Sequence, residues 1–193
     1  MHPIHLLKTW LEEEKAENVP YAQHAVLSTQ GTNGQVHGRV VAIREIDEEK
    51  LLFFTQKRTR KVEEIKTNPA VSLVFWFEQS GREVIIEGEA AFLSEMQNEH
   101  YWKTYPKPAQ IRFCSYAPTS GLAIDSKQLL ENKRLEIEEL YQKERSLPLS
   151  KDYCGIAVKP LRFVFYAYRL DELSDVWEYQ MNGSAFVKRL LSP

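Results

Sequence analysis

The sequence of 193 residues lacks several features that would assign it to a class at once. It has no run of about 18 apolar residues, so we do not expect it to span a membrane. It has neither a GxGxxG nor a P-loop pattern, which excludes the two commonest nucleotide-binding motifs. Its net charge is only −2, so no global field would recruit nucleic acid or an anionic membrane. Any anion site must therefore be local.

Cysteine and metal-ligand patterns are equally sparse. Cys114 and Cys154 are the only two thiols, and they lie far apart in the sequence. The N-terminal residues 1–5 show no apolar signal-peptide core. Together these observations predict a cytoplasmic protein with free thiols. His24 and His37 have no spacing typical of a metal site, so we expect structural roles for them and no bound metal.

The pattern that is present is rich in short strands. There is no internal repeat, low-complexity tract or linker, and 43% of residues are apolar, so we expect one domain over residues 1–193. Strand-like runs cover 24–29, 35–44, 51–55, 70–77, 82–93, 153–158, 161–170 and a closing hairpin at about 177–190. We expect a turn at Lys159-Pro160 and a close approach or bulge at Gly88. The pattern predicts a mainly β protein, an antiparallel barrel with peripheral helices.

Helical patterns fall between these strands. We expect helices over residues 4–17, 60–66 and 126–145, a capped helix start at Ser94 and a short helix after Lys107-Pro108. In the first helix, Glu12 to Glu14 should face solvent. In the helix over 126–145, the predicted inner stripe consists of Leu129, Leu130, Ile137 and Leu140.

The most informative stretch runs from Arg39 to Lys61. Arg39 and Arg44 bracket an apolar strand, and a second strand leads through Thr55 to Arg60-Lys61 at the start of a helix. A helix N-terminus suits a phosphate, because its N–H groups are unpaired and its dipole end is positive. Basic residues in a first helical turn oppose the dipole, and a bound phosphate would reverse the sign of that cost. The stretch therefore predicts a phosphate site, although Arg39 and Arg44 could also be solvated strand-edge charges.

The order of motifs along nearly the whole chain resembles the pyridoxamine 5′-phosphate oxidase family, the FMN-binding split barrel. The resemblance is carried by the segments 39–44, 54–61, 68–69, 82–88, 101–102, 110–111, 177–180 and 189–193. It implies an antiparallel split β-barrel and a homodimer with two FMN sites, each built from both subunits. It also implies a small-molecule substrate and an FMN-dependent oxidoreductase.

The resemblance also implies roles for single residues. Arg39 and Lys61 would bind the FMN phosphate, with Arg60 and Thr55 beside them. The remaining positions implied for the flavin are Val40, Val41, Arg44, Phe54, Glu83, Thr119, Ser120 and Tyr166. Arg44 would also reach the substrate, together with Tyr101. Glu83 and Tyr166 stand where the family has a glutamine and a tryptophan. Thr119 and Ser120 lie near a Gln-Ser pair that the family donates from the second subunit.

Departures from the family cluster on the substrate side. The segment 172–176 retains only Asp175 of an Arg-x-His-Asp-Arg stretch, and Tyr105 and Ala109 replace an arginine and a serine. An anion loses a charge-assisted hydrogen bond, about 1.5–3 kcal/mol, for each such arginine. The resemblance therefore implies a flavoenzyme with altered substrate choice. The alternatives are a flavin or B6-phosphate binding protein without turnover, and a split barrel that holds haem or a deazaflavin.

Other interpretations of single residues stay open. Glu83 could pair with Arg82 or with a lysine on a neighbouring strand instead of facing a flavin. Tyr101 lies on a predicted helix, where an aromatic side chain usually serves the core or an interface. Along the strand 161–170, alternation places Phe163 and Phe165 on one face and Tyr166 with Tyr168 on the other.

Overall fold

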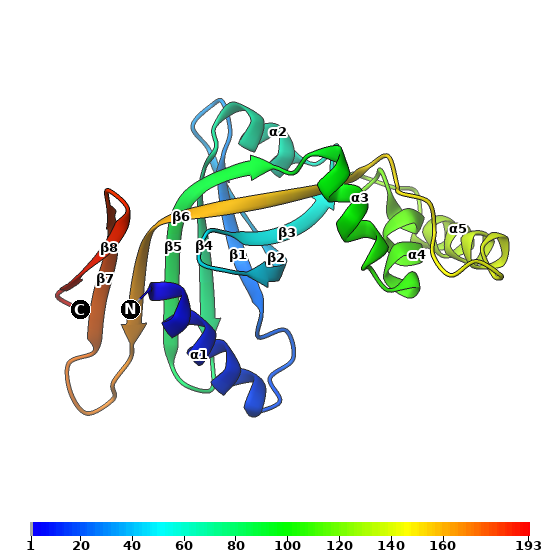
Figure 1. Cartoon of the computed structure of the whole chain (residues 1–193). Helices are drawn as coiled ribbons and strands as arrows, with labels where there is room; N and C mark the ends of the chain where they lie inside the picture. Colours follow the sequence, from blue (N-terminus) through cyan, green and yellow to red (C-terminus); the bar gives the residue numbers. More distant parts are fainter. Residues whose placement is uncertain (1) are drawn as a thin grey trace. The chain divides into compact units, whose positions relative to one another are not determined.

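The computed structural model describes residues 2–193, which form five helices and eight strands (Figure 1). In chain order these are α1 (Pro3–Ala16), β1 (His24–Gln30), β2 (Val36–Ile46), β3 (Leu51–Gln56), α2 (Arg60–Thr67), β4 (Ala70–Phe77), β5 (Arg82–Phe92), α3 (Glu95–Lys103), α4 (Lys107–Tyr116), α5 (Lys127–Leu140), β6 (Tyr153–Ala167), β7 (Asp175–Asn182) and β8 (Ala185–Leu190).

All strands belong to one sheet in the order β3-β2-β1-β4-β5-β6-β7-β8, and β3 also pairs with β6. That extra pairing closes six strands into a barrel, from which β7 and β8 continue the sheet. The pairs β1–β2, β1–β4, β2–β3, β4–β5, β6–β7 and β7–β8 are antiparallel. The predicted mainly β fold with an antiparallel barrel is confirmed.

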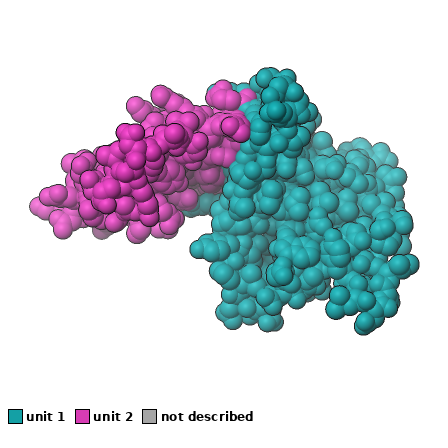
Figure 2. Space-filling model, turned by 180° about the vertical axis from the view of Figure 1, so that it is seen from behind, with its two compact units in different colours: residues 1–53, 64–91, 157–193 teal, residues 54–63, 92–156 magenta. Residues whose placement is uncertain are grey.

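The chain divides into two compact units, coloured separately in Figure 2. Unit 1 comprises residues 1–53, 64–91 and 157–193, and unit 2 comprises residues 54–63 and 92–156. Unit 1 contains α1 and most of the sheet, whereas unit 2 contains α3, α4 and α5. The expectation of one domain over the whole chain stays a prediction.

The core of unit 1 joins α1 to the sheet. Leu7 and Trp10 are buried on α1, and the Trp10 ring meets Phe165 edge-on with the ring centroids 5.2 Å apart. One expectation for α1 is wrong: Glu14 is buried, with 2% of its surface exposed. Its carboxylate accepts hydrogen bonds from the backbone N–H and the hydroxyl of Ser80. Both bonds go to Oε1, whereas Oε2 is buried without a partner among the described residues, so only half of this carboxylate is compensated for its burial.

The predicted turn at Lys159-Pro160 is also wrong, because β6 runs without interruption from Tyr153 to Ala167. The reason lies on β5. A Cβ atom added at Gly88 would lie 2.2 Å from the Lys159 carbonyl oxygen, so only glycine permits this approach. The expected close approach at Gly88 is thus confirmed, and it lets the strand pass Pro160. Farther along β6, Phe163 and Phe165 are fully buried, as the alternation predicts.

The C-terminal hairpin is confirmed as β7 and β8. Asn182 pairs with Ala185, so Gly183 and Ser184 form the two-residue loop. Gly183 has φ +63°, a conformation that glycine adopts without steric cost.

Within residues 2–193, no helix combines the length and the apolar character needed to cross a lipid bilayer.

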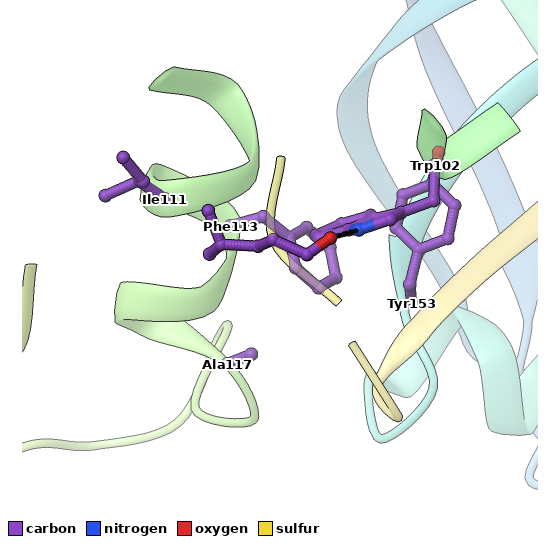
Figure 3. Packing of buried hydrophobic residues seen from close by; sticks show 6 residues of the cluster. Trp102, Ile111, Phe113, Ala117 and Tyr153 are labelled. Carbon is purple, nitrogen blue, oxygen red and sulfur yellow. Dashed lines mark hydrogen bonds between the residues drawn. The ribbon is translucent and has the colours of Figure 1, made fainter. Parts of the chain in front are cut away.

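The core of unit 2 is an aromatic cluster, shown in Figure 3. The Trp102 and Tyr153 ring centroids lie 4.8 Å apart, and Phe113 of α4 meets Tyr153 edge-on at 5.4 Å. Trp102 Nε1 donates to the Leu147 carbonyl at 2.8 Å, so the indole is satisfied although it is buried. The side chain of the buried Gln110 bonds to the backbone of both residues: its Nε2 donates to Trp102 O, and its Oε1 accepts from Leu147 N.

The helices of unit 2 support one expectation and correct another. Ser94 and Gln97 form the predicted capping box at the start of α3. On α5, however, Leu129 and Leu140 are 54% and 74% exposed, so the expected inner stripe is wrong at these two positions. Ile137 does pack against the aromatic cluster. The exposed surface of α5 instead carries ion pairs one turn apart, such as Arg134 with Glu131 and Glu138.

Candidate functional site

The start of α2, in unit 2, concentrates positive charge. Lys61 Nζ donates to the Thr55 hydroxyl at 3.0 Å, which links the helix to the end of β3. Arg60 is exposed on the first turn and makes no side-chain hydrogen bond or ion pair with any residue of the 2–193 range. The first turn also carries Glu63, so the two cations exceed the carboxylate by one charge, and an added anion would lower the energy of this positive helix end. The donors present, an ammonium, a guanidinium and a hydroxyl, therefore suit a phosphate group.

A buried glutamine ties a loop of unit 2 to the same place. Gln56 is 1% exposed; its Oε1 accepts from Ser120 N at 3.1 Å, and its carbonyl accepts from the Thr59 hydroxyl at 2.9 Å. Thr119 donates its hydroxyl to Tyr116 O at 2.8 Å. Gln56 Nε2 is buried without a partner among the described residues. The predicted positions Thr119 and Ser120 are thus held beside the end of β3.

Arg39 lies in unit 1, on β2, inside a hydrogen-bond network. Its Nη1 donates to the Thr29 hydroxyl at 2.5 Å and to Leu27 O at 3.3 Å, and its Nη2 lies 3.4 Å from Glu64 Oε2. Thr29 in turn donates to Glu64 Oε2 at 2.5 Å, and His37 Nδ1 lies 2.6 Å from Glu64 Oε1. The guanidinium is therefore already oriented by a carboxylate and a hydroxyl.

Glu64 is an ionised group in this network although only 7% of its side chain is exposed. Burial acts to raise the pKa of Glu64. The hydrogen bonds from Thr29 and His37 and the charges of His37 and Arg39 outweigh burial and hold that pKa below its ordinary value.

The other predicted positions on β2 differ in exposure. Val41 is buried, whereas Val40 is 63% exposed, as strand alternation requires. Arg44 is half-buried at an irregularity, because Ile43 pairs with Phe53 and Glu45 already pairs with Leu52. Arg44 is thus the extra residue of a β-bulge, a feature that redirects a side chain and is frequent beside active sites.

Phe54 and Tyr101 pack together in unit 2. The Phe54 ring stacks on Tyr153 with centroids 4.9 Å apart, and its centroid lies 5.2 Å from that of Tyr101. Both Phe54 and Tyr101 are half-buried, so each borders the aromatic cluster and keeps some surface for a ligand. Tyr101 therefore has a packing role, and its predicted substrate role stays a prediction.

Glu83 and Tyr166 lie in unit 1, in a group of outward aromatic side chains. Glu83 accepts a hydrogen bond from the Tyr168 hydroxyl at 3.1 Å. The Tyr168 ring centroid lies 4.3 Å from that of Tyr166 and 5.6 Å from that of Trp76. Arg82, the other partner considered for Glu83, pairs with Glu13 instead. Whether Glu83 faces a flavin stays a prediction.

The segment that departs from the family is held by its own ion pair. Arg169 Nη2 lies 2.7 Å from Asp175 Oδ2, and Arg169 Nε lies 3.9 Å from Glu172 Oε1. Val176, which follows, is buried. Counting Arg169 against Asp171, Glu172 and Asp175, residues 169–176 carry a net charge of −2. This segment does not present a cationic surface to an anion.

Sequence reasoning missed Thr29 and Glu64 as neighbours of the predicted site. A signal for Thr29 was available, because alternation along β1 places it on the buried face with Ala25 and Leu27. A buried polar side chain needs a partner, and Glu64 supplies it. No sequence signal could have found Gln56, because it reaches Ser120 across 64 residues.

Comparison with known proteins identifies the family. The sequence profile described as pyridoxamine 5′-phosphate oxidase matches residues 11–141 of this chain. Proteins named pyridoxine/pyridoxamine 5′-phosphate oxidase from Trichormus variabilis and Yersinia pestis are 28% and 29% identical over 193 and 192 residues. The alignments cover 100% of this chain and 89% and 87% of those proteins.

Two solved structures share the fold. PhzG from Burkholderia lata 383, in complex with tetrahydrophenazine-1-carboxylic acid, matches with a TM-score of 0.88 and 24% identity, covering 100% of this chain and 93% of its own. A pyridoxamine 5′-phosphate oxidase-related, FMN binding protein from Nostoc punctiforme matches with a TM-score of 0.79 and 16% identity, covering 98% and 96%. At these identities the similarity establishes the split-barrel fold.

Proposed function

The chain belongs to the pyridoxamine 5′-phosphate oxidase family, and on this premise we propose that it is an FMN-dependent oxidoreductase with an altered substrate. The observation that carries the proposal is the cationic start of α2, where Lys61 already engages Thr55 and Arg60 is exposed. An isoalloxazine ring supplies hydride acceptance when it is bound, so the protein has to supply binding, orientation and electrostatics.

Three side chains at α2 and β3, Lys61, Arg60 and Thr55, would hold the FMN phosphate. Arg39 is the further predicted phosphate ligand. On the ring side, Glu83 and its neighbours Tyr166 and Tyr168 would face the flavin, and a carboxylate there would disfavour negative charge on the ring.

The substrate differs, in this proposal, from the B6 phosphates named in the relatives. The net charge of −2 over residues 169–176 supports it, because like charge repels a phosphate ester. Arg44 at the β2 bulge and Tyr101 on α3 are the residues proposed to hold the substrate. A cytoplasmic location belongs to the same proposal and agrees with the free thiols of Cys114 and Cys154.

Flavin binding can be tested by the absorption spectrum of the purified protein, because bound FMN should give bands near about 370 and 450 nm. Lys61→Ala should weaken FMN binding by about 10- to 100-fold, because a charge-assisted hydrogen bond to phosphate is lost. Riboflavin, which has no phosphate, should bind both proteins equally. Lys66→Ala, at the opposite end of α2, is the matched control.

Equal FMN affinity of wild type and Lys61→Ala would reject the phosphate site, and a haem Soret band in the purified protein would reject the cofactor.

Activity is tested separately by peroxide release with pyridoxine and pyridoxamine 5′-phosphates. A slow rate with both, alongside tight FMN binding, is the expected result. An ordinary enzyme rate with either would contradict the altered substrate.

We also propose a homodimer with the FMN sites at the subunit interface. An outer apolar row crosses four strands of unit 1, formed by Val40, Val26, Val74 and Ile85, which are consecutive cross-strand partners. Val40 and Val26 are 63% and 42% exposed. A contiguous apolar row on the solvent face of a sheet is typical of a surface that a partner covers.

Sedimentation or light scattering tests this proposal. Val26→Lys places a charge in the middle of the row and should convert a dimer to monomers, whereas Val187→Lys, at a 50% exposed position on β8, should not. A wild-type monomer, or a Val26→Lys dimer of unchanged affinity, would reject the interface.

A further inference from the structure

Glu64 is a buried carboxylate that the proposed function does not use directly. It lies on α2, and its contacts in unit 1 come from two strands: Thr29 of β1, and His37 and Arg39 of β2. Each of its two oxygens is engaged, Oε1 by His37 and Oε2 by Thr29 and Arg39. A buried charge of this kind is costly unless several partners surround it.

The contacts form a closed ring around the Arg39 guanidinium. Nη1 donates to the Thr29 hydroxyl, that hydroxyl donates to Glu64 Oε2, and the same oxygen faces Nη2 at 3.4 Å. Thr29 is 2% exposed, so its hydroxyl is confined to these partners. A guanidinium held in this way has lost its rotamer freedom before any ligand arrives.

We propose that Glu64 is a positioning residue, which orients Arg39 for a phosphate directly and through Thr29, while His37 holds the other oxygen of the carboxylate. The proposal rests on the proposed function, since FMN supplies the phosphate. Preorganised donors bind more tightly because less side-chain entropy is lost on binding. Glu64 itself, at 7% side-chain exposure, acts only through Arg39.

The charge of Glu64 also opposes an anion near Arg39, so the two effects have opposite signs. The orienting effect dominates in this proposal, because Glu64 Oε2 and the Thr29 hydroxyl are 2.5 Å apart and the ring of bonds is complete. The repulsion is reduced by the positive charge of Arg39 itself, whose Nη2 lies 3.4 Å from the carboxylate.

The test compares the dissociation constants of FMN and riboflavin, measured by quenching of flavin fluorescence. Glu64→Ala should weaken FMN binding by about fivefold to tenfold and leave riboflavin binding unchanged. Glu64→Gln should restore most of the loss, because its carbonyl still accepts from the Thr29 hydroxyl and its side chain keeps the length and shape of the glutamate. Glu89→Gln removes the same charge from an exposed position on β5 and should bind as wild type does.

A merely structural role would lower the melting temperature of Glu64→Ala without changing the ratio of the two dissociation constants, and that result would overturn the proposal. Tighter FMN binding by Glu64→Ala would overturn it too, because repulsion would then dominate. If wild type binds no FMN, the proposed function and this proposal both fail. If Lys61→Ala loses FMN selectivity and Glu64→Ala keeps it, only the positioning role fails.

Discussion

Replacing Gly88 with alanine should separate β5 from β6. An added Cβ would lie 2.2 Å from the Lys159 carbonyl oxygen, 3.0 Å from its carbon and 3.2 Å from Pro160 Cα. Nonbonded carbon atoms prefer about 3.5–4.0 Å, so the two strands would have to part by roughly 1 Å. All three atoms belong to the backbone, and no side-chain rotation can relieve the overlap.

The expected loss of stability is about 2–3 kcal/mol. Overpacking of a core costs about 1–3 kcal/mol, and a rigid backbone neighbour places Gly88→Ala at the upper end. The smaller conformational entropy of the unfolded alanine chain returns only about 0.4–1 kcal/mol. For a chain of 193 residues the melting temperature should fall by about 4–12 °C.

The matched control is Gly38→Ala on β2. A Cβ there would meet only Val26 Cγ1, at 3.6 Å, an ordinary contact. This variant should be unchanged or more stable by about 0.4–1 kcal/mol. Urea unfolding of both variants measures the difference from the midpoints. A Gly88→Ala midpoint equal to that of Gly38→Ala would refute the close-approach argument.

Two further predictions concern buried polar groups. Gln110→Leu should lower the stability of unit 2 by about 1–3 kcal/mol, because it leaves the buried Leu147 N unpaired, whereas Trp102 O keeps its bond from Tyr105 N. Gln110→Glu should be less harmful at acidic pH, and urea titration followed by tryptophan fluorescence measures both variants. Glu64 has a pKa below its ordinary value in the folded protein. Its contribution is therefore complete above the unfolded-state value, about 4.3, and is lost as the pH falls through the lower folded-state pKa. The urea midpoint of unfolding should fall less with decreasing pH for Glu64→Gln than for wild type. Parallel plots of midpoint against pH for the two proteins would contradict this.

Local patterns determined most of the secondary structure. The helix start at Ser94, the strand alternation around Phe163 and the C-terminal hairpin depend on residues close in sequence, and each was predicted. The wrong expectations share another cause. The Lys159-Pro160 turn was wrong because Gly88, on a different strand, accommodates the proline-containing backbone.

The local sequence pattern also could not predict which side chains are buried. Glu14 in an acidic run looks like a solvated residue until Ser80 is found beside it. Leu129 and Leu140 look like a core stripe, yet α5 buries neither of them. In both cases the decisive neighbour, or its absence, depends on packing between segments far apart in the sequence.

For the candidate site, the sequence by itself led to the prediction of a phosphate ligand. Basic residues on a strand and at a helix start, Arg39, Arg60 and Lys61, indicate a phosphate ligand because helix dipole and charge act locally. Only the tertiary structure decided that Arg39 shares the carboxylate of Glu64 and the hydroxyl of Thr29. Hydrogen bonds act over about 3 Å, and only folding brings β1, β2 and α2 within that distance.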